Sequence, residues 1–296
     1  MQVATLTYRG LTLWGGMRGQ WRDHYLTSLD GWEAFSANRE TASRPNAHGQ
    51  WATRAFVPSK TVIAKGWSKS ATRRDEIFQM LAQAMSLPAS GGEPQILRVD
   101  TMGRDLFAYA TVTAFDPWDV YENLKDGFFG WKIEFSLDDP MRYSSSEAGT
   151  YTTGLDNGLS SGLEFDLFSD EDSADSTGYL EFGEPNDSGR VVFQNHGTTD
   201  AWPEFEVYSP DPFRIVHGET GRTIEYSEPV PEGNTVTINQ QLGNALLQGI
   251  GDRSGFLSRR EWFSIPAGQQ GTIRFVTDTK YKPEAKMIVR VRSTYL

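Results

Sequence analysis

Short runs in which apolar and polar residues alternate predict that the chain is built mainly of β-strands. In the first half these runs are rich in aromatic and β-branched residues, which favour strands. They fall at residues 3–14, 56–67, 96–100, 106–118 and 128–144. Gly10 interrupts the first run, and the turn at 138–140 lies within the last. The pattern predicts an N-terminal β-sandwich or barrel-like domain over residues 1–143.

One segment of the first half has helical rather than alternating spacing. Its apolar positions are Ile77, Phe78, Leu81, Ala82 and Met85. Ser70 or Thr72 is a suitable N-cap, and Pro88 lies beyond the expected end. We interpret the apolar stripe as the face with which a single helix covers a sheet, rather than as a groove for a partner.

The second half reads as many short strands with Gly, Pro, Asn or Asp between them. From residue 163 to residue 296 no window has helical spacing, and no repeat of fixed period occurs. Such a pattern is typical of an antiparallel β-sandwich. The preceding stretch, residues 144–162, is polar and glycine-rich, so we expect a linker or loose domain entry there.

Charge separates the two halves and limits the kinds of partner. The net charge is −11, but residues 1–142 hold 16 Lys and Arg against 16 Asp and Glu. Residues 143–296 hold 12 against 23, so all the excess negative charge lies in the second half. Such a surface repels a phosphate backbone, and we expect no specific nucleic-acid binding. The sequence shows neither a secretory signal nor a membrane span.

The motifs for catalysis and metal binding are weak. Residues 158–162 match the G-x-S-x-G pattern literally, but they lack the strand before and the helix after that a nucleophile elbow requires. The carboxylates at 170–175 do not follow the EF-hand order and read as a solvated loop. The chain has no cysteine, and its four histidines are scattered. We therefore expect no enzyme activity, no metal and no cofactor.

Four segments of the second half together resemble the C-terminal, galectin-like half of the distal tail proteins (Dit-like, siphovirus-type tail components or minor tail proteins) of long-tailed bacteriophages. These segments are Gly189–Asn195, Pro203–Val207, Pro231–Asn234 and Glu261–Gly268. In the first half, Arg44–Gly49, Ile133–Ser136 and Asp139–Tyr143 resemble the same family. The order and spacing of the segments carry the resemblance over nearly the whole chain.

The resemblance implies a structural virion protein whose C-terminal domain, residues 163–296, is galectin-like. Relatives form a ring, usually of about six copies, at the distal end of the tail. The implied partners are further copies of the chain, the tail tube protein, the tape measure protein, and the hub or tip proteins with receptor-binding proteins. Assembly would take place in the host cytoplasm, without a membrane. A carbohydrate- or receptor-binding tail-tip protein is the alternative.

Two segments are the candidate functional residues. The polar, turn-rich stretch at 37–50 is too long for a tight turn, and we expect it to order as an arm against a neighbouring subunit. The candidate arm residues are Arg44, Pro45, Asn46, His48, Gly49 and Trp51. In the C-terminal domain, we expect a hairpin formed by Trp262, Phe263, Pro266 and Gly268 with the strand at 272–276. We interpret Trp262 as core or sheet-edge packing, and stacking on a sugar stays open.

Overall fold

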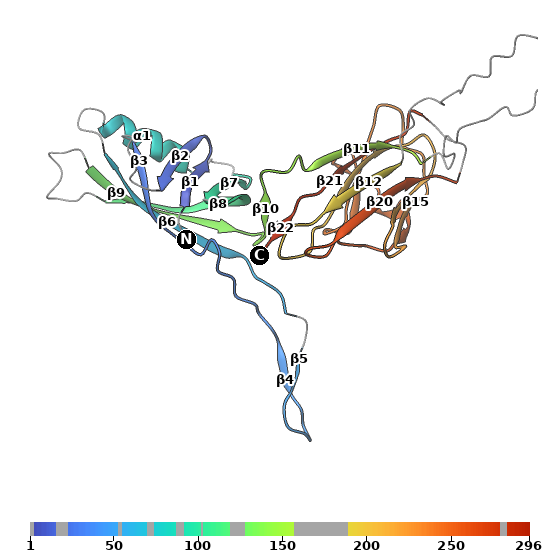
Figure 1. The fold of residues 1–296 in the computed structure, drawn as a ribbon, viewed down its shortest axis with the longest axis horizontal. Coiled ribbons are helices and arrows are strands. Elements are labelled where there is room, and N and C mark those ends of the chain that lie inside the picture. Colours follow the sequence, from blue (N-terminus) through green and yellow to red (C-terminus); the bar gives the residue numbers. More distant parts are fainter. Residues whose placement is uncertain are drawn as a thin grey trace, which may run out of the picture. The chain divides into compact units, whose positions relative to one another are not determined.

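The chain folds into two compact units. The computed structural model describes residues 3–15, 23–52, 55–69, 74–86, 92–101, 103–118, 128–156, 189–278 and 283–296. The first unit comprises residues 1–147 together with 294–296, and the second comprises residues 148–293. Both are built mainly of β-strands, as the alternating sequence pattern predicts (Figure 1).

A closed barrel of seven strands forms the centre of the first unit. Its strands follow each other in the order β8-β7-β1-β2-β3-β6-β9, and β9 pairs with β8 to close the ring. All neighbours are antiparallel except β2 and β3, which are parallel. The strands are β1 (Val3–Tyr8), β2 (Leu11–Gly15), β3 (His24–Asp30), β6 (Lys60–Lys69), β7 (Gln95–Thr101), β8 (Arg104–Trp118) and β9 (Phe128–Leu137).

Along these strands every second residue points into the barrel, and most of these buried residues are apolar. In β6, for example, Val62, Ala64, Gly66 and Ser68 are buried while the residues between them are more exposed. The buried set includes Leu6, Leu13, Trp131, Ile133 and Phe135. Gly66 is opposite Trp131 across β6 and β9, and the missing side chain leaves room for the indole ring. The barrel is therefore a packed core.

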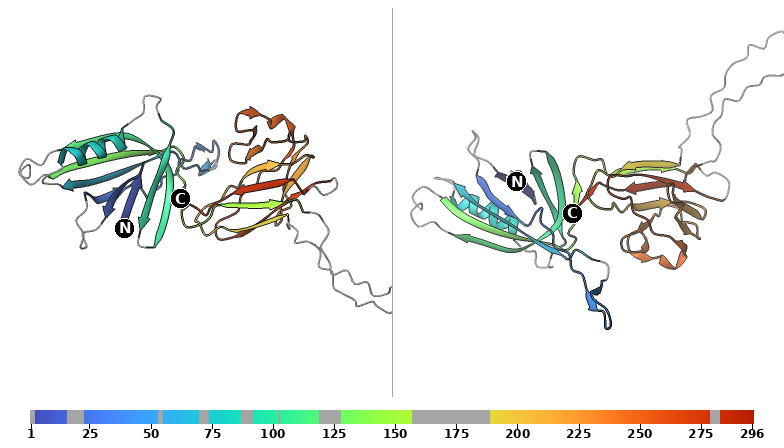
Figure 2. Two further views of the ribbon diagram at one scale, coloured as in Figure 1. Left: turned by 90° about the horizontal axis from the view of Figure 1, so that it is seen from above. Right: turned by 60° about the horizontal axis from the view of Figure 1, so that its bottom comes forward.

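The predicted helix is present as α1 (Arg74–Met85). Ile77, Leu81 and Met85 are buried in the barrel's core cluster, so the helix covers the barrel, as its apolar stripe predicts (Figures 1 and 2). The side chain of Arg9 donates hydrogen bonds to the carbonyl oxygens of Ala84 and Ser86 and so satisfies the helix end. Among the described residues, no helix is long and apolar enough to cross a membrane.

The last strand of the chain belongs to the first unit. β10 (Arg142–Ser144) pairs with β8, and β22 (Thr294–Tyr295) pairs with β10. The Nη2 atom of Arg142 donates a 2.6 Å hydrogen bond to the carbonyl oxygen of Leu296. Residues 294–296 thus group with the first unit, whereas the sequence analysis placed them in the domain over 163–296.

The second unit is an antiparallel sandwich of two sheets (Figure 2). The six-stranded sheet contains β11 (Thr150–Gly154), β21 (Lys286–Arg290), β13 (Glu204–Tyr208), β16 (Val236–Asn239), β17 (Asn244–Leu247) and β18 (Gly251–Asp252). The five-stranded sheet contains β12 (Arg190–Gln194), β20 (Gln270–Val276), β14 (Phe213–His217), β15 (Thr223–Tyr226) and β19 (Leu257–Arg260). A 3-10 turn, η2 (Ser254–Phe256), precedes β19.

The sandwich begins earlier in the chain than the sequence predicts. Residues 144–162 were expected as a linker or loose domain entry, and within them Thr150–Gly154 form β11 and pair with β21 along its length. Leu155 is fully buried in the sandwich core, so this part of the expected linker is structural. The two strands expected between residues 163 and 182 lie outside the described residues.

Candidate functional site

The candidate arm is a hairpin that does not belong to the barrel sheet. Its strands β4 (Thr41–Ser43) and β5 (Gln50–Ala52) pair with each other in a separate two-stranded sheet (Figure 1). At the tip, the amide of Arg44 donates to the carbonyl oxygen of Gly49, which has a φ of 95°. Glycine adopts this left-handed conformation without steric cost. Most of the expected arm, residues 41–50, thus belongs to a defined hairpin that continues to residue 52.

The arm exposes its side chains to solvent. Every residue from Arg44 to Trp51 is exposed, and the guanidinium of Arg44 lies 4.7 Å from the centre of the Trp51 ring. The structure brings the six sequence-predicted arm residues together: Arg44, Pro45, Asn46, His48, Gly49 and Trp51. A two-stranded hairpin without a covered face is marginally stable in water. Its role in subunit contact stays a prediction.

The segment at 262–268 does not form the expected hairpin. Pro266 and Gly268 do form a turn, in which the amide of Gln269 donates to the carbonyl oxygen of Pro266. However, β20 pairs with β12 and β14, whereas Ile265 bridges to Ala201. The backbone before the turn therefore pairs with the segment at Ala201 and not with β20.

Phe263 lies in the core of the sandwich, and Trp262 lies next to that core. Phe263 is 1% exposed, its ring stacks on His217 at 4.7 Å, and its amide donates to Gln240. Trp262 is partly buried and packs against the sandwich core. Phe263 is too deeply buried to serve as a platform for a sugar, whereas for the partly buried Trp262 stacking on a sugar stays open.

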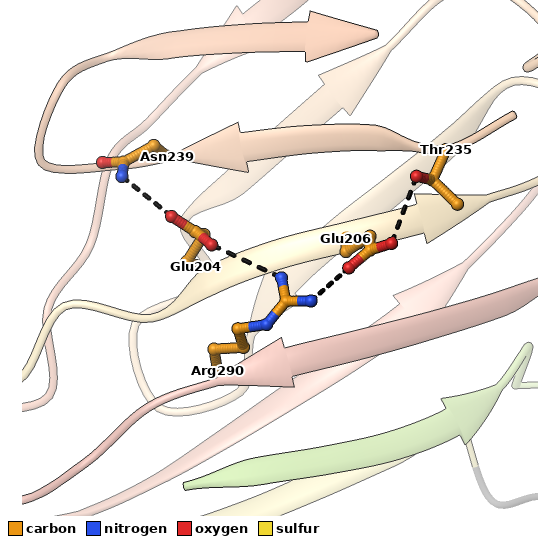
Figure 3. Close-up of polar contacts among 5 residues, drawn as sticks. All are labelled: Glu204, Glu206, Thr235, Asn239 and Arg290. Carbon is orange, nitrogen blue, oxygen red and sulfur yellow. Dashed lines mark hydrogen bonds and ion pairs between the residues drawn. The ribbon is translucent and has the colours of Figure 1, made fainter. Parts of the chain in front are cut away.

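The outer face of the six-stranded sheet carries a polar network that the sequence analysis did not identify (Figure 3). Arg290 on β21 forms ion pairs with Glu204 and Glu206 on β13. Asn239 donates a 3.0 Å hydrogen bond to Glu204, and Thr235 donates a 3.2 Å hydrogen bond to Glu206. The network joins three strands. Glu204 and Glu206 lie two residues apart in β13 and therefore share one face of the strand. This spacing was the only feature of the sequence that indicated the network.

The histidines do not gather into a metal site. Among the described residues, no group of three or more His, Cys, Asp or Glu side chains is placed to hold a metal ion. His24 is buried in the barrel, where its Nδ1 lies 2.7 Å from the hydroxyl of Ser68. His217 is buried in the sandwich, with Nδ1 2.7 Å from the Thr220 hydroxyl and Nε2 3.1 Å from Glu219. The Nδ1 atom of each of these two imidazole rings thus lies within hydrogen-bonding distance of a hydroxyl of the same unit.

Both buried histidines are expected to make the protein less stable in mild acid. Burial lowers the pKa of His24 and of His217 below the ordinary value of 6.5 because it disfavours the charged imidazolium. The unfolded chain therefore binds protons at a higher pH than the folded chain. The free energy of unfolding should decrease as the pH falls through 6.5.

Urea unfolding between about pH 7.5 and about pH 5.5 would measure this effect. The variant His217→Gln keeps a hydrogen-bonding side chain without a titratable group, and it should reduce the slope for the sandwich while leaving that of the barrel. A midpoint that does not change over this range would contradict the expectation.

The other sequence motifs lie outside the described residues. These are the G-x-S-x-G match at 158–162 and the carboxylate cluster at 170–175. Their interpretation as a linker and a solvated loop stays a prediction.

Over most of its length the chain resembles solved structures of bacteriophage proteins. Its fold matches the Dit (gp 19.1) protein of SPP1, described as a paradigm of the hub adsorption apparatus in phages that infect Gram-positive hosts, with a TM-score of 0.59. The match covers 99% of both chains at 11% sequence identity. Two baseplate structures of phage p2 match with TM-scores of 0.44 and 0.47 at 12% and 11% identity. These cover 86% and 95% of this chain and 91% and 99% of the other.

At the level of sequence, no family model and no curated protein matches the chain. The similarity is therefore one of fold. The residues matched to SPP1 Dit extend over both units.

Proposed function

We propose that this chain is a structural protein of a bacteriophage virion, located at the distal end of the tail. There it forms a ring that joins the tail tube to the tail-tip and host-adsorption apparatus. The observation that carries the proposal is the match in fold to SPP1 Dit over 99% of both chains. The order and spacing of the four segments in the second half that resemble the family support the same assignment.

The two units take different roles in this proposal. The barrel unit, with balanced charge, forms the ring and stacks on the tube, since like-charge repulsion between its copies is weak. The acidic, galectin-like sandwich lies at the outside of the ring and serves as the attachment point for hub, tip or receptor-binding proteins. The tape measure protein is a further partner. The function requires no enzyme activity and no cofactor.

The mass of the purified protein in solution tests the proposal. Light scattering across a range of concentration should reveal a closed oligomer of about six copies, and electron microscopy should show a ring. A monomer at every concentration that binds glycans on an array would overturn the ring and support the alternative, a carbohydrate- or receptor-binding tail-tip protein.

The arm supplies a second prediction. Deleting residues 43–49 should abolish the ring while the barrel remains folded, because the arm's strands pair only with each other. Circular dichroism and the melting temperature would check the fold, and light scattering would check the assembly. Leu242→Ser, at an exposed position on the sandwich, is the matched control. An undisturbed oligomer would rule out the arm as an assembly element.

A further inference from the structure

A cleft of about 490 Å³ lies in the first unit, where the turn between β7 and β8 meets β10 and β22. The described residues that line the cleft all belong to this unit. They include Asp100, Arg104, Leu106, Ser144, Ser146 and Tyr295. Ligand pockets in proteins have volumes of about 300 to 1,000 Å³, so the cleft is large enough for a ligand.

Arg104 presents an unpaired guanidinium group at this cleft. The residue is exposed, and its Cζ atom lies 5.7 Å from the centre of the Tyr295 ring. Among the described residues, no carboxylate lies within ion-pair distance of Arg104. The ring holds the guanidinium by a cation–π contact, which leaves the N–H groups at its edge free to donate. Such a planar group binds carboxylates through two parallel hydrogen bonds.

The backbone that carries Arg104 is fixed by hydrogen bonds. Thr101 and Arg104 pair with each other at the ends of β7 and β8, and the Thr101 hydroxyl donates a 3.0 Å hydrogen bond to the carbonyl oxygen of Arg104. The amide of Ser145 donates a 2.9 Å hydrogen bond to the carbonyl oxygen of Asp105, which ties the start of β8 to the segment after β10. The position of the Arg104 backbone is therefore set before a ligand binds, and this lowers the entropy cost of binding.

The two carboxylates that line the cleft differ in their availability. Asp105 accepts two hydrogen bonds from Arg98, which compensates its charge. The side chain of Asp100 has no hydrogen bond or ion pair with any residue in the described part of the chain, so its oxygens can accept from a ligand. The cleft therefore offers one free cation, Arg104, and one free carboxylate.

These groups fit a peptide segment better than an inorganic anion. The free guanidinium of Arg104 selects a carboxylate or a phosphate, but Asp100 in the same cleft repels a doubly charged phosphate. Asp100 in turn requires an N–H donor, which the peptide backbone carries. Leu106 and the ring of Tyr295 add an apolar surface on which the CH₂ groups of an acidic side chain can pack.

We propose that the cleft binds a peptide segment of a partner protein, which places a Glu or Asp carboxylate on Arg104 and a backbone N–H group on Asp100. The site goes beyond the proposed ring, because it requires neither contact between copies nor the sandwich. It gives the barrel unit a surface that recognises an acidic segment through an arginine.

Saturation-transfer NMR with the whole chain tests the site, since this method observes the ligand and tolerates a large assembly. The probes are three pools of acetylated, amidated pentapeptides with Glu, Gln or Lys at the central position. The Glu pool should bind, and its strongest member should have a dissociation constant about tenfold lower than the same peptide with Gln, because the Gln peptide lacks the charge-assisted pair. The Arg104→Gln protein should bind the Glu peptide about tenfold more weakly.

Arg190→Gln is the matched control, because it removes an exposed arginine from the sandwich and should leave peptide binding unchanged. The Arg104→Gln protein should keep its melting temperature, since the residue is exposed and has no ion pair among the described residues. Absence of binding by all three pools, or equal binding of the Glu peptide by the Arg104→Gln protein, would overturn the inference. So would displacement of the peptide by inorganic phosphate or free glutamate at equal concentration. Each of these results would leave the ring standing, because its test is the mass in solution.

Discussion

Replacing Gly66 by alanine is expected to lower the free energy of unfolding of the barrel by about 3 kcal/mol or more. A Cβ atom at this position would lie 2.1 Å from the carbonyl oxygen of Tyr25 and 2.4 Å from a ring carbon of Trp131. Neither neighbour can move freely. The carbonyl belongs to β3, and the indole is fully buried with its Nε1 donating to Ser68.

Urea unfolding followed by tryptophan fluorescence would measure this loss. Seven of the nine tryptophans lie in residues 1–147, so the signal reports mainly on the barrel unit. Gly103→Ala is the control, because an added Cβ there meets nothing within 4 Å, and its free energy of unfolding should change by no more than about 0.5 kcal/mol. Equal unfolding midpoints for the two variants would show that β6 and β9 approach each other less closely than described.

The substitution Phe263→Ala is expected to lower the free energy of unfolding of the sandwich by about 3–5 kcal/mol. The ring is 1% exposed, stacks on His217 at 4.7 Å and lies 6.0 Å from the ring of Phe205. Removing the ring leaves a cavity beside His217 and Phe205. Calorimetry should show the transition of the sandwich at a lower temperature while the transition of the barrel is retained.

The exposed residue Leu242 provides the comparison for this experiment. Leu242→Ala should change the free energy of unfolding by no more than about 0.5 kcal/mol because the side chain is largely in water. If Phe263→Ala proved equally mild, Phe263 would not be a core residue, and a role in binding a ligand would have to be considered again.

The sequence by itself determined the local elements and the class of fold. The helical spacing from Ile77 to Met85 predicts α1, and the alternating runs predict the long strands β6, β8 and β9. These patterns are readable because a strand repeats every two residues and a helix every 3.6. The order of degenerate segments also indicated the family whose fold the chain shares. For the arm, turn residues indicated a surface segment.

Only the tertiary structure decided which strands are neighbours. Closure of the barrel between β8 and β9, the parallel pair β2 and β3, and the return of β22 to β10 all join residues far apart in the chain. Local alternation specifies the buried face of a strand but not its partner. For the same reason the sequence could not show that Phe263 is core, or that Glu204, Asn239 and Arg290 belong to one polar network. Three strands must pair before those side chains meet.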